Sequence, residues 1–130
     1  MIYLDTCVLV YLVQCDTGLT SLIVNAMSRR AGDRFAISPL VEMECLVFPL
    51  KHDDVEMELA YRTAFETYRS IPLTRAVFEE AAQLRARHGL KVPDALHLAT
   101  AKTSGCSALW TNDDRLAKAA PGYALSVRRL

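Results

Sequence analysis

Short apolar runs alternate along the chain with longer segments whose apolar residues recur at helical spacing. The short runs predict five buried strands, at Ile2–Leu4, Phe35–Ile37, Ile71–Leu73, Ala108–Trp110 and Tyr123–Val127. The helical segments between them suit the long crossovers that parallel strands need. The pattern therefore predicts an α/β fold with a parallel sheet and helices on both faces.

Three of the intervening segments carry an apolar stripe along one helical face. The stripes are Leu19, Leu22, Ile23, Ala26 and Met27; Met57, Tyr61, Ala64, Phe65 and Tyr68; and Val77, Ala81 and Leu84. We expect Gly89 to end the third helix, because glycine adopts the left-handed conformation of a helix end without strain.

Proline marks the start of two further helices. Ser38-Pro39 predicts an N-cap followed by proline at the first helical position. Val92-Pro93-Asp94 opens an Ala-rich helix through Lys102, since proline is tolerated in the first turn and keeps the residue before it out of helical geometry.

Size and composition predict one compact domain covering residues 1–130. The chain has 130 residues, 52% of them apolar, and no repeat or linker divides it. The 15 Lys and Arg balance the 15 Asp and Glu, so any contact with nucleic acid must be local. The longest apolar run, Cys7–Val13, is far shorter than the roughly 20 residues of a membrane span, and no secretory signal is present. We expect a cytoplasmic protein without a membrane contact.

Cysteine usage points away from a zinc site and from a disulfide framework. The four cysteines form no C-x-x-C pair and lie in apolar contexts. We interpret Cys7, Cys15, Cys45 and Cys106 as buried free thiols.

Acidic residues follow two of the predicted strands. Asp5 comes directly after the first strand, and Asp113 follows Ala108–Trp110 after the short Thr111-Asn112 step. Both would emerge at the same edge of a parallel sheet, where open α/β sheets bind ligands. Either acid alone is explained more readily as a helix cap or turn former, so the pair is more informative than its members.

Two further polar residues lie on the helix that starts at Val92. Asp94 stands at its amino end, where a carboxylate either caps the helix or takes part in a site. His97 lies one turn beyond Asp94. A lone histidine on a packed helix is more often a core residue with satisfied hydrogen bonds than a metal ligand, and we interpret His97 in that way.

Helical geometry separates Glu44 from Glu42. Residues two apart lie roughly 200° apart around a helix axis, so the two acids cannot face one site. The neighbours of Glu42 one turn away include Ser38 and Pro39, whereas those of Glu44 are all apolar: Leu40, Val41, Val47 and Phe48. Glu44 is therefore the acid predicted to point inward.

An inward acid without a basic partner in its stripe requires either a proton or a metal ion. A metal ion would also explain why Asp5, Asp94 and Asp113 converge on one edge. Carboxylates about 4 Å apart repel by about 4 kcal/mol at an effective dielectric constant of about 20. Oxygen ligands favour Mg²⁺ or Mn²⁺ over zinc, and such a site suits phosphodiester hydrolysis.

Four short motifs occur in order along nearly the whole chain. They are Ile2-Tyr-Leu-Asp5-Thr6, Ser38-Pro-Leu-Val-Glu-Met-Glu44, Pro93-Asp94-Ala-Leu-His-Leu-Ala-Thr-Ala101 and Leu109-Trp-Thr111-Asn-Asp113. Together they resemble the PIN-domain family and, within it, the VapC-type toxins of bacterial toxin–antitoxin pairs. The chain departs from the pattern at Cys7, where many members have Asn or Ser.

This resemblance implies a three-layer α/β/α sandwich around a central, mostly parallel sheet, and an endoribonuclease that depends on Mg²⁺ or Mn²⁺. The residues that match the family's acidic quartet are Asp5, Glu44, Asp94 and Asp113, with Asp5 and Asp94 as the principal metal ligands, and Thr6 and Thr111 match its small hydroxyl positions. Asp113 is preferred to Asp114 by its position after Thr111. The resemblance also implies RNA as substrate, a cognate antitoxin protein as partner, and a homodimer.

Three basic clusters are candidates for substrate contacts. They are Arg29, Arg30 and Arg34; Arg85, Arg87, His88 and Lys91; and Arg128 and Arg129. Each is explained more readily as a solvated face. The cluster before Asp94 is the best candidate, because it leads directly to the predicted site and would neutralise phosphates.

Two alternative functions stay open at this point. A phosphatase of the haloacid-dehalogenase type also has an acid after its first strand, but that family has a second Asp two positions on, where this chain has Cys7. A catalytically idle PIN-like module that binds RNA or protein would share the fold. Four mutually repelling acids argue against an idle site. Whether Glu42 or Asp114 assists the quartet is not determined by the pattern.

Overall fold

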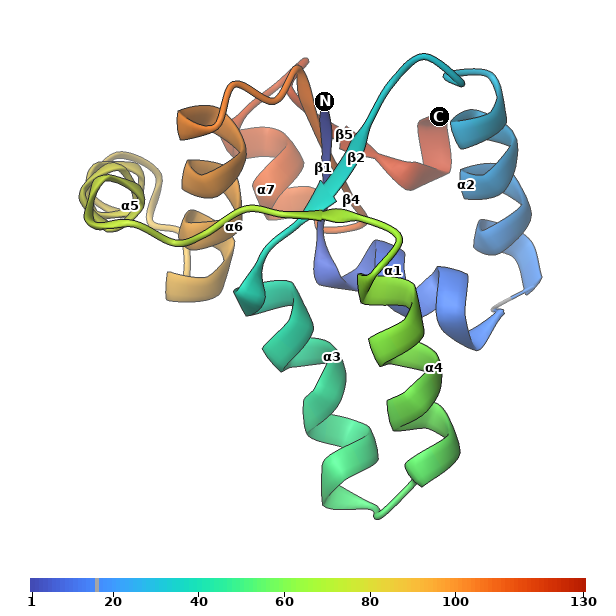
Figure 1. Cartoon of the computed structure of the whole chain (residues 1–130). Helices are drawn as coiled ribbons and strands as arrows, with labels where there is room; N and C mark the ends of the chain where they lie inside the picture. Colours follow the sequence, from blue (N-terminus) through green and yellow to red (C-terminus); the bar gives the residue numbers. More distant parts are fainter. Residues whose placement is uncertain (16) are drawn as a thin grey trace.

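The chain folds around a five-stranded sheet in which every neighbouring pair of strands is parallel (Figure 1). The structure is a computed structural model that describes residues 1–15 and 17–130. Its strands are β1 (Ile2–Leu4), β2 (Phe35–Ile37), β3 (Arg69–Ser70), β4 (Ala108–Thr111) and β5 (Ala124–Ser126), in the order β3-β2-β1-β4-β5. Because β2 and β4 lie on opposite sides of β1, the strand order reverses at β1. Open α/β sheets form their ligand sites at such a reversal.

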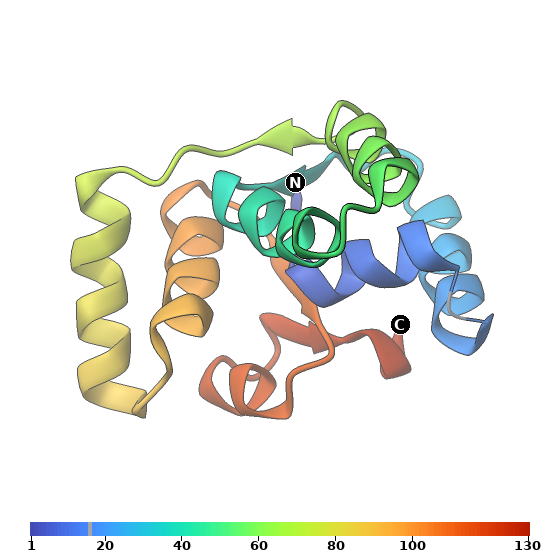
Figure 2. The same cartoon turned by 90° about the horizontal axis from the view of Figure 1, so that it is seen from below.

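Helices flank this sheet in the expected three-layer α/β/α arrangement. In the described residues they are α1 (Thr6–Gln14), α2 (Thr17–Ser28), α3 (Pro39–Lys51), α4 (Val55–Phe65), α5 (Arg75–His88), α6 (Val92–Thr103) and α7 (Asp114–Ala119), followed by the 3-10 helix η1 (Val127–Arg129). Helices α3 and α4 pack together as a pair that projects beyond the strands, and α5 packs against α6 (Figures 1 and 2).

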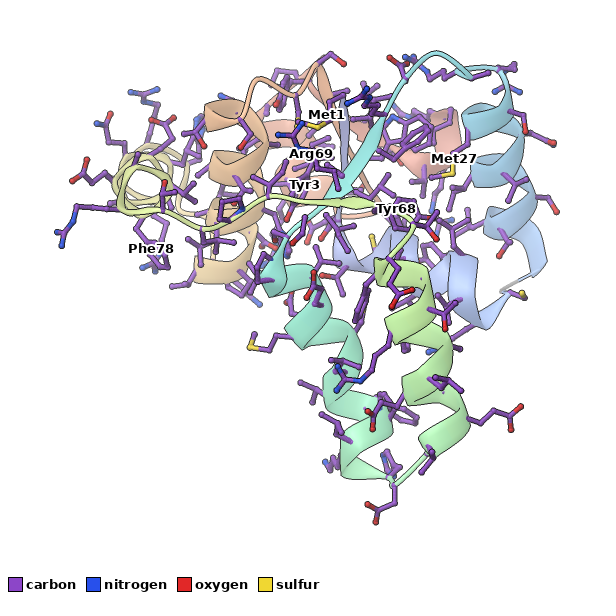
Figure 3. All side chains as sticks on the ribbon, viewed as in Figure 1. Met1, Tyr3, Met27, Tyr68, Arg69 and Phe78 are labelled. Carbon is purple, nitrogen blue, oxygen red and sulfur yellow. The ribbon has the colours of Figure 1, made fainter. Side chains whose placement is uncertain are left out.

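The two central strands supply the middle of the core. All residues of β1 and β4 are buried, as expected for parallel strands covered on both faces. Trp110 and Tyr3 are the largest fully buried side chains. By contrast, Phe78 projects outward from α5, and Arg69 lies on the edge strand β3 (Figure 3).

The third strand was predicted in the wrong place, since β3 lies at Arg69–Ser70 rather than at Ile71–Leu73. The Ile71 N–H still donates to the Ile37 carbonyl at 2.9 Å, but Pro72 has no N–H with which to continue the ladder. Both residues of β3 are exposed at the edge of the sheet, so this strand carries no apolar run. The fifth strand is also shorter than predicted.

The predicted helix boundaries are largely confirmed. Gly89 ends α5 with a left-handed φ of 64°, α6 starts at Val92, and Ser38 is the N-cap of α3. The Ser38 hydroxyl makes no capping hydrogen bond, however, because it bonds to Tyr3 instead.

Three burial or helix predictions were wrong at single residues. Leu22 is 42% exposed although it belongs to the predicted stripe of α2, and Tyr68 lies beyond the end of α4. Cys15 is exposed at the end of α1, where it takes a left-handed conformation. Of the other thiols, Cys45 and Cys106 are buried and Cys7 is half-buried.

The helices of the described segments are too short to span a membrane singly. No single helix among them is long and apolar enough to cross a bilayer. Helices α1 and α2 meet the length and composition requirement only when they are taken together, and their axes are bent by 106°.

The packing around β4 predicts a large stability loss on truncation of Leu109. This residue is fully buried, so Leu109→Ala should lower the free energy of unfolding by about 2–5 kcal/mol through lost apolar contact and a residual cavity. Val24→Ala on the exposed face of α2 is the control and should change it by no more than about 0.5 kcal/mol. Urea unfolding of both variants measures the difference, and equal losses would contradict the described core.

Candidate active site

The end of β1 places Asp5 beside the end of β4. The Asp5 N–H donates to the Trp110 carbonyl at 3.0 Å, and the side chain caps α1 by accepting from the Thr6 N–H at 2.7 Å. The other carboxylate oxygen accepts a 2.6 Å hydrogen bond from the Thr111 hydroxyl. Asp5 is only 8% exposed, so these donors satisfy an acid that has little access to water.

Thr111 also connects Asp5 to the next acid along the chain. Its hydroxyl oxygen accepts from the Asp113 N–H at 3.0 Å while its hydrogen goes to Asp5. Asp113 is the N-cap of α7, and its Oδ1 accepts from the N–H groups of Arg115 and Leu116. Asp114, the alternative acid, is exposed in the first turn of α7 and lines a surface hollow that contains Arg128.

Glu44 reaches the same region from α3. Its Oε1 accepts from the Thr6 hydroxyl at 2.7 Å and from His97 Nε2 at 2.6 Å. Glu42 has a different environment, because its carboxylate accepts a 3.1 Å hydrogen bond from the hydroxyl of Ser70 in the edge strand β3. The two acids thus have separate neighbours, as the helical geometry predicted.

His97 is buried, as we expected, but it is bonded to the acidic residues rather than only to the core. Its Nε2 lies 2.6 Å from Glu44 Oε1 and 3.5 Å from Asp5 Oδ1. Nε2 must carry the hydrogen toward Glu44, since an ionised carboxylate only accepts. His97 therefore bridges two members of the predicted quartet.

A chain of hydrogen bonds holds the imidazole from its other side. Tyr3 lies inside the molecule, and its hydroxyl is 2.9 Å from His97 Nδ1 and 2.7 Å from the Ser38 hydroxyl (Figure 3). Sequence reasoning missed this network. One available signal was the strand period of two, which puts Tyr3 and Asp5 on the same side of the chain.

The pKa values of His97 and Glu44 shift in opposite directions. Burial lowers the pKa of His97, but the hydrogen bond to Glu44 and the charges of Asp5 and Glu44 outweigh it, and the pKa is raised above 6.5. Partial burial raises the pKa of Glu44, but the hydrogen bonds from His97 and Thr6 outweigh that effect, and the pKa is lowered below 4.5. Both shifts favour imidazolium beside carboxylate.

Asp94 is the acid without a bonded partner. It lies in the first turn of α6, and no hydrogen bond or ion pair is formed with its carboxylate by any described residue. Burial raises its pKa, and the neighbouring charges of Asp113 and Asp5 raise it further. Three acids from separate elements are therefore near enough to repel one another.

The donor set of this cluster fits a hard divalent cation. The four acids offer oxygen ligands, and no Lys or Arg of the described residues forms an ion pair with any of them. Across the described ranges, no three His, Cys, Asp or Glu side chains already form a group able to hold an ion. A bound ion would therefore require side-chain adjustment, and it would relieve the repulsion that raises the pKa of Asp94.

Cys7 stands at the position where the phosphatase alternative needs a second acid. Burial and the Asp5 charge raise the pKa of its thiol to about 12, so the thiol is neutral at physiological pH. Its Sγ is 3.7 Å from Asp5 Oδ2 and accepts from the Asn112 N–H at 3.3 Å. The side chain thus acts as a weak donor to Asp5 and supplies no second carboxylate.

A three-layer sandwich with acids at the ends of its central strands is the architecture of a PIN domain, and the chain belongs to the PIN domain family, which matches residues 2–121. It is 34% identical to Ribonuclease VapC35 of Mycobacterium tuberculosis, over 98% of this chain and 95% of that protein.

Solved structures share the fold. A toxin-antitoxin complex from Klebsiella pneumoniae contains a chain that is 26% identical to this one, with a TM-score of 0.80 and 98% of both chains covered. VapC20 of Mycobacterium tuberculosis, a toxin that cleaves the sarcin-ricin loop, has a TM-score of 0.76 at 16% identity, with 92% of this chain and 95% of that one covered. At that identity the second likeness concerns the fold alone.

The His97–Glu44 pair predicts a pH-dependent contribution to stability in metal-free protein. A histidine whose pKa is raised in the folded state stabilises the fold fully below its unfolded pKa, and this contribution is lost as pH rises through the folded pKa. A glutamate whose pKa is lowered in the folded state stabilises the fold above its unfolded pKa, and this contribution is lost as pH falls through the folded pKa. Wild type should therefore exceed His97→Gln in unfolding free energy most clearly between pH 4.5 and 6.5, and less at alkaline pH.

Urea unfolding in EDTA across this range measures that difference. Taking the difference between the two proteins at each pH removes any constant packing loss caused by the substitution. A difference that did not change with pH would show that folding leaves the pKa of His97 unchanged, and it would contradict the His97–Glu44 ion pair.

Proposed function

We propose that this chain is a metal-dependent endoribonuclease that hydrolyses RNA phosphodiester bonds, and that it is the toxin of a toxin–antitoxin pair. The observation that carries the proposal is Asp94, a half-buried carboxylate that has no bonded partner among the described residues and whose pKa is raised by burial and by the neighbouring acids. Such an arrangement is costly unless a cation is bound there. The likeness to Ribonuclease VapC35 over nearly the whole chain supports the same reaction class.

In this proposal Asp5, Asp94 and Asp113, with Glu44, hold Mg²⁺ or alternatively Mn²⁺. The bound ion would neutralise phosphate charge and lower the pKa of the attacking water. Mg²⁺ keeps several waters and commonly takes only one or two protein carboxylates, which suits acids that do not already form a closed cage.

The remaining residues act by orienting these carboxylates. The Thr111 hydroxyl donates to one Asp5 oxygen, and the Thr6 N–H at the start of α1 donates to the other. Together these two donors fix the orientation of the carboxylate. Thr6 and His97 hold Glu44 through a single oxygen, Oε1, and keep it ionised. We propose Thr6 and Thr111 as supporting residues for this reason.

RNA cleavage with a single-stranded substrate in Mg²⁺ tests the reaction. Asp5→Asn and Asp94→Asn should each lower the rate by more than the about 10- to 100-fold typical of residues that only orient a ligand, and EDTA should abolish it. Asp53→Asn is the matched control, since Asp53 is exposed in the turn that joins α3 to α4, and it should cleave at the wild-type rate. Cleavage that survives both EDTA and Asp5→Asn would reject the proposal.

Metal binding can be measured without any substrate. Isothermal titration calorimetry with Mn²⁺ should show binding to wild type and much weaker binding to Asp94→Asn, because the variant removes one negative charge and one ionised ligand. The Asp53→Asn protein should bind as wild type does. Failure of wild type to bind either Mn²⁺ or Mg²⁺ would favour the idle PIN-like module that binds RNA or protein.

We further propose that a cognate antitoxin protein binds this chain, that the chain forms a homodimer in the cytoplasm, and that residues 1–130 form one domain. The likeness to the Klebsiella pneumoniae toxin-antitoxin complex supports the antitoxin partner. Large apolar side chains, including Val47, Phe48 and Leu59, are more than half exposed on α3 and α4, and exposed patches of this kind mark protein contacts. A small neighbouring reading frame encoding a DNA-binding domain and a disordered tail would strengthen the assignment.

A further inference from the structure

A basic hollow of about 300 Å³ lies between the turn that joins α5 to α6 and helix α7. One wall is formed by residues His88 to Lys91, and the other by Arg115, Lys118 and Ala119. Figure 2 shows this turn and α7 on the same side of the molecule. No carboxylate of the described residues lines the hollow, although acids are close by in the sequence on both sides.

Both walls of the hollow lead directly to members of the acidic quartet. Lys91 is the N-cap of α6, and Asp94 lies in the first turn of the same helix. Arg115 lies in the first turn of α7, and Asp113 is the N-cap of that helix. The hollow and the acidic cluster therefore share two helix starts, so a ligand that occupies one lies beside the other.

The cationic groups of the hollow are available to a ligand. The side chains of Lys91, Arg115 and Lys118 are exposed, and none forms an ion pair within the described residues. Arg85, from the same sequence cluster as Lys91, is engaged differently, because its Nε donates to the Leu90 carbonyl at 3.0 Å and so holds the turn. Arg87 does not line the hollow at all.

We propose that this hollow binds a backbone phosphate of the RNA substrate, next to the phosphate that is cleaved. The inference rests on the proposed ribonuclease function and names a substrate subsite for it. An acidic cluster repels a polyanion, so binding requires cations placed close to the cluster but outside it. Cations that contact phosphates fix the position of the RNA but do not distinguish its bases, so the subsite would bind RNA of many sequences.

Binding of a fluorescein-labelled single-stranded RNA of mixed sequence tests the subsite. The Asp5→Asn protein serves as the starting form, because it should not cleave the probe. Adding Lys91→Ala and Lys118→Ala should weaken binding and reduce the slope of log Kd against log salt concentration by at least about 0.7, the value for one lost phosphate contact on a single strand. Adding Lys91→Arg and Lys118→Arg instead should retain the slope.

Arg87→Ala is the matched control, since it removes a cation from the same helix end that does not line the hollow. Its affinity and salt slope should equal those of the starting form. Equal slopes for the double Lys→Ala form and the starting form would overturn the subsite. So would an equal loss of slope in Arg87→Ala, because that would indicate a diffuse basic surface.

Kinetics separate this inference from the proposed function. In the otherwise native chain, Lys91→Ala with Lys118→Ala should raise KM more than it lowers kcat, because a remote phosphate contact is made equally in the ground and transition states. Mn²⁺ binding by calorimetry should be unchanged, which shows that the acids are intact. Cleavage with unchanged KM and salt slope would reject the subsite alone, whereas absence of any cleavage by wild type would reject the ribonuclease itself.

Discussion

Repulsion between carboxylates at the ends of β1 and β4 is the constraint on which the rest of the site depends. The parallel sheet brings Asp5 and Asp113 to one edge, and α6 adds Asp94. Hydrogen-bond donors offset part of the cost. Thr111 bridges the strand-end acids through one hydroxyl, and the N-termini of α1 and α7 offer backbone N–H groups to Asp5 and Asp113. Asp94 receives no such donor from any residue that the structure describes, so the charge that stays uncompensated is concentrated there.

Among the described residues, His97 is the basic side chain that pairs directly with these acids. The imidazole of His97 lies between Glu44 and Asp5, and burial would keep it neutral if those acids were absent. The Tyr3 hydroxyl holds the opposite nitrogen and is itself bonded to Ser38, so the ring cannot rotate away without leaving buried polar groups unpaired. The network therefore gives Glu44 an environment unlike that of Asp94. Glu44 is held in place by the fold, whereas in our proposal Asp94 is available to an external cation.

Several features of the fold that depend on short stretches of sequence were predicted correctly. The apolar runs located β1, β2 and β4, and the strand-end rule brought Asp5 and Asp113 to one edge. The edge strand β3 escaped detection because its residues face water and need not be apolar. The link between Tyr3 and His97 joins residues 94 positions apart, and no periodicity encodes such a contact. The same holds for the basic hollow, because only the fold places Arg115 and Lys118 opposite Lys91.

Because the chain as a whole carries no net charge, the attraction of a phosphate depends on where individual charged residues lie. With equal numbers of basic and acidic residues, the chain has no long-range field that would draw in a polyanion. At physiological salt the Debye length is about 8 Å, so only cations close to the acidic cluster affect a phosphate that approaches it. Lys91 lies three residues before Asp94, and Arg115 lies two residues after Asp113, so each of the two helix starts carries a cation close to its acid. The same two helix starts thus carry acids that repel phosphate and cations that attract it. In the proposed ribonuclease, the RNA would then be held at the hollow, and its scissile bond would reach the acids only when a cation is bound there.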